Sequence, residues 1–166
     1  MTQTEKNRVN RHPEFLFRAE ADALYGVAAS GQAQVLAFER EMAELSDKMI
    51  LEVSALFDDH EIELDFSEES LEELDKLISQ VWSEPVEDAE TLDAIVANWG
   101  AYLGEMIREN VGGSWTFRQD LDHASLHFSR DGLEAFPLHV VRKRFQLGQG
   151  ETLAGFYAAL LARLTA

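Results

Sequence analysis

The sequence predicts an α+β fold, in which N-terminal helices precede a small antiparallel sheet of about three strands and C-terminal helices cover one face. Apolar residues recur every three or four positions over residues 32–57, 68–82 and 89–110, which is the period of amphipathic helices. Beyond residue 114 apolar and polar residues alternate, and Asp131-Gly132 is a typical hairpin turn. A length of 166 residues fits one domain with a sizeable core.

A single domain is therefore expected over residues 1–166, because no repeat or low-complexity linker divides the chain. Within this domain we distinguish a flexible N-terminal segment (1–12), a helical hairpin (13–58) and an α+β core (59–166).

The hairpin consists of two predicted helices. The first runs from about Glu14 to Ala29, because Pro13 suits the first helical position and Gly31 suits the end. The second runs from Gln32 to about Phe57. Its expected core face contains Val35, Phe38, Met42, Leu45, Met49, Val53 and Leu56.

Acidic and apolar residues then alternate over residues 61–66, a period of two. This segment is either a short edge strand or an extended linker that its apolar side chains hold against the core. Ser67 is suited to cap a third helix, Glu68 to Trp82, whose first turn carries the acids that a helix dipole favours. Pro85 ends it.

The fourth helix, from about Ala89 to Asn110, contains Gly100 and Gly104 one turn apart. Each glycine costs about 1 kcal/mol relative to alanine in a helix, so we expect another backbone to approach closely here. Gly112-Gly113 ends the helix. Strands are then expected around Trp115 and on both sides of the hairpin turn, and two short helices follow, over residues 138–147 and 151–164.

The net charge of −17 is confined to one third of the chain. Residues 39–93 contain 20 acids and three bases, whereas the segments on either side are neutral. Ten of the 18 residues from Asp58 to Asp75 are acidic, more than solubility requires, and such crowding is destabilising. This segment is therefore either a solubilising surface or a candidate surface for binding a partner. Its candidate residues are Asp58, Asp59, Glu61, Glu63, Asp65, Glu68, Glu69, Glu72 and Glu73.

Motifs of catalysis and of metal binding are absent from the sequence. There is no cysteine, no nucleophile elbow, no nucleotide-binding glycine pattern and no HExxH. His123 and His127 are about 13 Å apart if they lie along a strand, too far for one ion. Asp120, Asp122 and His123 suit an acid–base cluster, but they suit an ordinary surface loop equally well. We predict no catalytic residue, no metal site and no cofactor.

The one basic cluster is Arg142-Lys143-Arg144. It is either a solvated helix end or a clamp on the acidic segment, within the chain or between subunits. Arg142 and Arg144 are therefore candidate functional residues.

Three stretches together carry a resemblance: Leu64-Asp65-Phe66-Ser67-Glu68-Glu69-Ser70-Leu71-Glu72, Gly100-Ala101-Tyr102-Leu103-Gly104-Glu105, and Gly112-Gly113-Ser114-Trp115. Their order resembles an uncharacterised family of small bacterial proteins, a domain of unknown function. The resemblance covers about residues 60–160 and implies a fold, with no catalytic residue. Glu105 belongs to this pattern and is a candidate functional residue, although its place on the polar side of the helix favours a salt bridge.

These observations favour a non-catalytic acidic protein-binding module of the inhibitor, immunity or adaptor type, which docks a basic surface of a protein partner. One alternative is a DNA mimic that inhibits a nucleic-acid-binding protein, and another is an enzyme whose site the sequence does not reveal. A structural subunit is a further alternative, since Trp82, Trp99 and the Gly100/Gly104 surface could associate between chains in a homo-oligomer. With no signal peptide, no membrane span and this charge, we expect a cytoplasmic location and no direct binding to membranes or nucleic acids.

Overall fold

Five α-helices and a four-stranded antiparallel sheet form the part of the chain that the computed structural model describes, residues 15–17, 32–116, 120–130, 132–147 and 151–165. This is the predicted α+β fold. The helices are α3 (Gln32–Leu56), α4 (Glu68–Val81), α5 (Ala89–Val111), α6 (Pro137–Leu147) and α7 (Leu153–Thr165). The strands are β1 (Phe15–Phe17), β2 (Ser114–Thr116), β3 (Ser125–Phe128) and β4 (Leu133–Ala135), and two 3-10 turns are η1 (Asp58–His60) and η2 (Leu121–His123).

The sheet has the strand order β1-β4-β3-β2. The predicted hairpin of β3 and β4 is confirmed: Phe128 pairs with Leu133, and Gly132 adopts a φ of 65° in the turn. Strand β1 corrects the helix predicted from Glu14, because Phe15–Phe17 pair with β4 and cover its outer edge. A run of bulky apolar residues suits an edge strand, and pairing satisfies the backbone groups of β4. The rest of that predicted helix and residues 1–12 lie outside the described residues.

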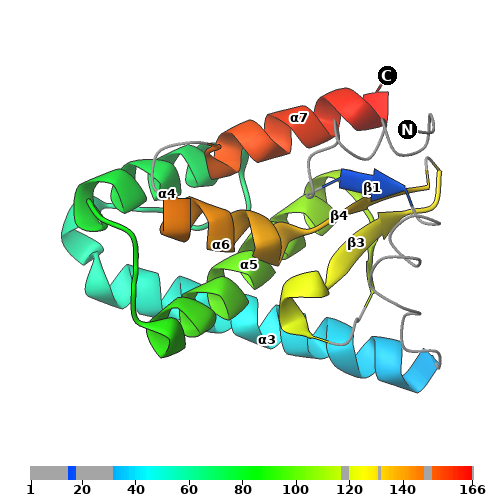
Figure 1. The fold of residues 1–166 in the computed structure, drawn as a ribbon, viewed down its shortest axis with the longest axis horizontal. Coiled ribbons are helices and arrows are strands. Elements are labelled where there is room, and N and C mark those ends of the chain that lie inside the picture. The colour runs from blue at the N-terminus through cyan, green and yellow to red at the C-terminus, as the bar shows by residue number, and fades with distance from the viewer. Residues whose placement is uncertain (1–14, 18–31, 117–119, 131, 148–150, 166) are drawn as a thin grey trace, which may run out of the picture.

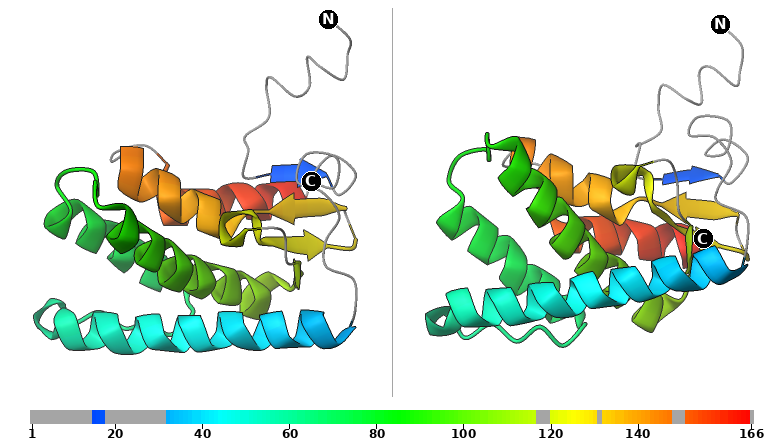
Figure 2. Two further views of the ribbon diagram at one scale, coloured as in Figure 1. Left: turned by 60° about the horizontal axis from the view of Figure 1, so that its bottom comes forward. Right: turned by 90° about the horizontal axis from the view of Figure 1, so that it is seen from below.

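Helix α5 lies between α3 and α6, while α4 packs against α7 (Figure 1). Figure 2 shows α3 running along one side of the molecule below α5, with the sheet near the C-terminal end of α5. The side chains between these elements form one core, with Met42, Leu71, Leu103, Trp115 and Phe156 among its fully buried members. None of the helices in the described ranges is both long and apolar enough to cross a membrane.

The two glycines of α5 are sites of close approach. A Cβ atom at Gly100 would lie 2.8 Å from the Cα atom of Leu138, so α6 begins directly against this helix. At Gly104 a Cβ atom would lie 2.1 Å from Cζ2 of Trp115. The predicted approach of another backbone is therefore confirmed at Gly100 and wrong at Gly104, where an indole ring occupies the space.

The predicted core face of α3 is confirmed at Phe38, Met42, Met49 and Val53, which are all buried. Leu56 is an exception with an exposed fraction of 72%, because it lies in the last turn of the helix at the end of the bundle. The same face also buries a polar residue that hydrophobic periodicity does not reveal, Ser46.

Candidate functional site

The acidic segment begins as a linker between α3 and α4. Residues 61–66 form no strand, so the extended linker is the correct one of the two alternatives. Ile62, Leu64 and Phe66 are partly buried against the core, whereas the acid that precedes each of them is exposed. The backbone is extended only in the middle of this linker, since Glu61 and Phe66 adopt positive φ angles of 53° and 61°, but all three acids are exposed to solvent.

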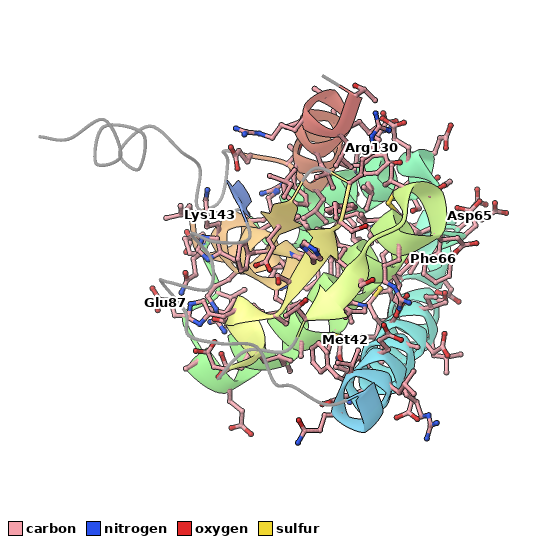
Figure 3. The ribbon with its side chains drawn as sticks, turned by 90° about the vertical axis from the view of Figure 1, so that its right-hand side faces the viewer. Met42, Asp65, Phe66, Glu87, Arg130 and Lys143 are labelled. Atoms are coloured by element: carbon pink, nitrogen blue, oxygen red, sulfur yellow. The ribbon has the colours of Figure 1, made fainter. Side chains whose placement is uncertain are left out.

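Phe66 fastens the end of this linker to α5. Its N–H donates to the Tyr102 hydroxyl at 3.0 Å, and its carbonyl accepts from Asn110 Nδ2 at 2.7 Å. Its ring stacks on the Tyr102 ring at a centroid distance of 5.0 Å. These contacts hold Phe66 at a φ of 61°, a conformation that bulky side chains rarely adopt. In Figure 3, Asp65 points outward beside this anchor, and Glu87 and Lys143 lie on the opposite side of the view.

Tyr102 also fixes the start of α4, because its hydroxyl lies 2.8 Å from the Ser70 hydroxyl. Burial raises the pKa of Tyr102 further above its ordinary value of 10.0. Sequence reasoning did not assign this role to Tyr102. Its signal was a tyrosine on the core face of a helix, since a buried phenol needs a hydrogen-bond partner.

Ser67 caps α4 as predicted, and its hydroxyl accepts from the Ser70 N–H at 3.2 Å. The Asp65 carboxylate accepts from both the N–H and the hydroxyl of Ser67, and these bonds lower the pKa of Asp65. The first turn of α4 and its outer side then present Glu68, Glu69 and Glu72, which are exposed.

The acids of the linker lie next to those of α4, because the linker runs back along this helix (Figure 1). The Glu63 N–H donates to the Glu73 carboxylate at 3.2 Å, and Ile62 and Lys76 line the same shallow pocket. Eight of the nine predicted binding residues are exposed and Glu73 is partly buried. We call these nine residues, which are Asp58, Asp59, Glu61, Glu63, Asp65, Glu68, Glu69, Glu72 and Glu73, the acidic surface.

The acidic surface is not neutralised from within the described ranges, where no lysine or arginine forms an ion pair with any of its nine residues. The His60 ring lies 3.0 Å from the Asp59 carboxylate.

Asp75, the tenth acid of the segment, faces inward instead. Its two carboxylate oxygens accept from the N–H groups of Leu153 and Ala154 at 2.9 and 3.0 Å, which caps α7. Nε of Arg144 lies 3.6 Å from the same carboxylate, and Arg144 also donates to the Ser79 hydroxyl. Burial raises the pKa of Asp75, against the effect of these donors. Arg144 is therefore an internal tie between α6 and the acidic segment.

Arg142 makes a different set of internal contacts. Its guanidinium pairs with Asp93 of α5 at 2.7 Å and with Asp122 of η2 at 2.5 Å. Asp120 caps η2 by accepting from the His123 N–H. The loop that suited an acid–base cluster thus contains residues that make structural contacts. In the part of the chain that is described, no three His, Asp or Glu side chains are placed to hold a metal ion.

Glu105 lies on the side of α5 that faces α3, and its side chain is 16% exposed. Both of its carboxylate oxygens lie 3.3 Å from Nη1 of Arg108, which also approaches Glu39 of α3 at 4.0 Å. Burial raises the pKa of Glu105, and Arg108 and the Trp115 indole oppose this effect. Sequence reasoning singled out Glu105 but missed Arg108, although the i, i+3 spacing of the two residues indicates a pair.

The surface suggested for association between chains is used within the chain. Trp99, Gly100 and Gly104 are buried, and the rings of Trp82, Trp99 and Phe145 pack edge to face with centroids 5.2 to 5.7 Å apart. Trp99, Gly100 and Gly104 therefore pack within the chain, whereas Trp82 is only partly buried.

Comparisons of the chain with protein-family models, with curated proteins and with solved structures found no match.

Proposed function

We propose that this chain is a cytoplasmic, non-catalytic protein-binding module of the inhibitor, immunity or adaptor type, which docks a basic surface of a protein partner. The observation that supports this proposal is the acidic surface, whose carboxylates face outward without a described lysine or arginine partner. A dense negative patch steers a basic partner into encounter and raises the association rate.

The ordered backbone of the linker and of the start of α4 supports the same proposal. Because Phe66 and Ser70 are bonded to Tyr102, the linker and the start of α4 are ordered before a partner arrives. Binding then costs less conformational entropy than the ordering of a flexible acidic tail would cost.

A DNA mimic is a second candidate, in which the carboxylates replace phosphates and the partner is a nucleic-acid-binding protein. The inward orientation of Leu64 and Phe66 favours it, since these apolar side chains do not interrupt the row of acids on the outer side of the linker. Under this candidate, duplex DNA should compete for the captured partner.

The test is affinity capture from the native cell at low and high salt, followed by charge reversal in the bait. We expect a captured partner to dissociate as salt rises, and the variant Glu63→Lys/Glu72→Lys to weaken its binding by at least about tenfold, since close charge pairs across interfaces contribute over 1.4 kcal/mol. The matched control is Glu84→Lys/Glu87→Lys, which changes the net charge equally at exposed sites outside the acidic surface.

An equal loss of binding in both double variants would show that only net charge matters. A partner whose binding is insensitive to salt would show that the contact is not electrostatic. Either result would contradict the proposal.

A further inference from the structure

A polar pocket of about 340 Å³ lies between α3, α5 and the linker. It has room for about ten water molecules, and it is at the small end of the range of ligand sites. It borders the acidic surface at Phe66 but is formed by other residues. The residues of its lining that matter here are Ser46, Asp47, Phe66, Glu105, Arg108 and Glu109.

The charge of this pocket is negative. Three carboxylates, from Asp47, Glu105 and Glu109, line it together with one guanidinium, from Arg108. Arg108 is already engaged by Glu105 at 3.3 Å and by Glu39 at 4.0 Å. Asp47 and Glu109 are exposed and form no ion pair with a lysine or arginine in the described ranges. A ligand that gains from these groups must therefore carry positive charge.

Ser46 supplies an independent indication of a ligand. Its side chain is 1% exposed, and its hydroxyl has no hydrogen-bond partner among the described residues. Most buried hydroxyl groups in proteins are hydrogen-bonded, because an unpaired one is destabilising. Because Ser46 lines the pocket, rotation of its side chain would turn the hydroxyl toward a ligand N–H group, which can supply the missing partner.

The shape of the site favours a guanidinium over an ammonium group. Its polar groups come from two helices, Ser46 and Asp47 from α3 and Glu109 from α5, and the aromatic residue Phe66 also lines it. A planar group with five donors reaches more of these acceptors than a compact ammonium does, and it packs well on an aromatic ring. Phe66 is held in place for this contact by Tyr102 and Asn110.

We infer that this pocket binds the guanidinium group of an arginine side chain that the basic partner presents. This inference rests on the proposed function and deepens it. The acidic surface attracts the partner, and the pocket beside it recognises one arginine.

The test titrates the full chain with ethylguanidinium and follows backbone amide shifts by NMR. We expect saturable shifts centred on the pocket, at Ser46, Glu105 and Gly113, with weaker responses to ethylammonium and to neutral urea. Asp47→Asn and Glu109→Gln should each weaken binding about two- to fivefold, which is the effect of an exposed ion pair. The control Glu87→Gln removes an exposed acid outside the pocket and should leave the affinity unchanged.

Ser46→Ala separates recognition from folding. It should weaken ethylguanidinium binding and raise the melting temperature of the free chain by roughly 2–4 °C, because it removes an unpaired buried hydroxyl. An unchanged affinity in this variant, or equal responses to urea and ethylguanidinium, would overturn the inference. Shifts centred on Glu63 and Glu72 would overturn it too, yet they would leave the proposed function of the acidic surface intact.

Discussion

At Gly104 the lack of a side chain determines how Trp115 packs on α5. A Cβ atom would lie 2.1 Å from a ring carbon of this fully buried indole, so Gly104→Ala forces the ring to move. Overpacking of this kind costs about 1–3 kcal/mol, and the gain in helix propensity returns at most about 1 kcal/mol. We expect a net loss in the free energy of unfolding, measured by urea denaturation.

Two further variants isolate the cause of that loss. Gly104→Ala/Trp115→Phe should recover part of it, because the smaller ring leaves room for the methyl group. Ala94→Gly, at an exposed position of the same helix, reports helix propensity alone. A Gly104→Ala variant as stable as the wild type would contradict the packing described here.

At the scale of elements, Asp75 connects α4 to the N-terminus of α7. Asp75→Ala leaves the N–H groups of Leu153 and Ala154 without their acceptor and removes the carboxylate beside Arg144, whose side chain is 5% exposed. Loss of a cap and of a partner to a buried charge together cost about 2–4 kcal/mol. Hydrogen exchange should also show that the amides of α7 lose protection before those of α5.

Asp88→Ala is the matched control for this variant, because Asp88 caps its own helix through the Thr91 N–H and is exposed. It should cost less than Asp75→Ala. Equal losses would mean that Asp75 is an ordinary cap with no long-range role.

The elements differ in how well the sequence predicts them. Helices α4 and α5 were predicted to within a residue or two at each end, because the period of their apolar residues and their ends agree. Strand β1 was missed, since three residues beside an Ala-rich segment carry no local sign of the β4 edge that they cover. The start of α7 was placed at Glu151 instead of Leu153; Thr152 caps this helix locally through the Gly155 N–H, and Asp75 adds a second cap from another helix.

In the candidate site, too, local features could be predicted from the sequence and long-range contacts could not. The outward orientation of the acids followed from alternation along the linker and from the helical period of α4. The anchoring of the linker did not, because Tyr102 and Asn110 are 36 and 44 residues from Phe66 in the chain. Ser46 was also beyond prediction, since periodicity indicates a core position but not whether a hydroxyl there has a partner.

At the scale of the whole molecule, a net charge of −17 makes stability depend on pH. Self-repulsion between carboxylates destabilises the folded chain, and protonation relieves it. Burial raises the pKa values of Glu105 and Asp75, so the folded chain binds these protons more tightly than the unfolded chain does. Their contribution to stability is therefore present below the unfolded pKa and is lost as pH rises through the folded pKa.

Asp65 and Asp88 have the opposite effect. Hydrogen bonds lower their pKa values below the ordinary 3.8, so their contribution to stability is present above that value and is lost as pH falls through the lowered pKa.

We therefore expect the melting temperature to rise as pH falls from 7 to about 5, and to fall again below about pH 4. Added NaCl should flatten the upper part of this profile by screening the repulsion. Salt does not screen the cost of burying a carboxylate, so at high salt Glu105→Gln should flatten the upper part of the pH profile further. Glu87→Gln, at an exposed site, should leave the high-salt profile unchanged. A melting temperature that is highest at pH 7 and falls steadily on acidification would show that stabilised carboxylates outweigh both repulsion and burial.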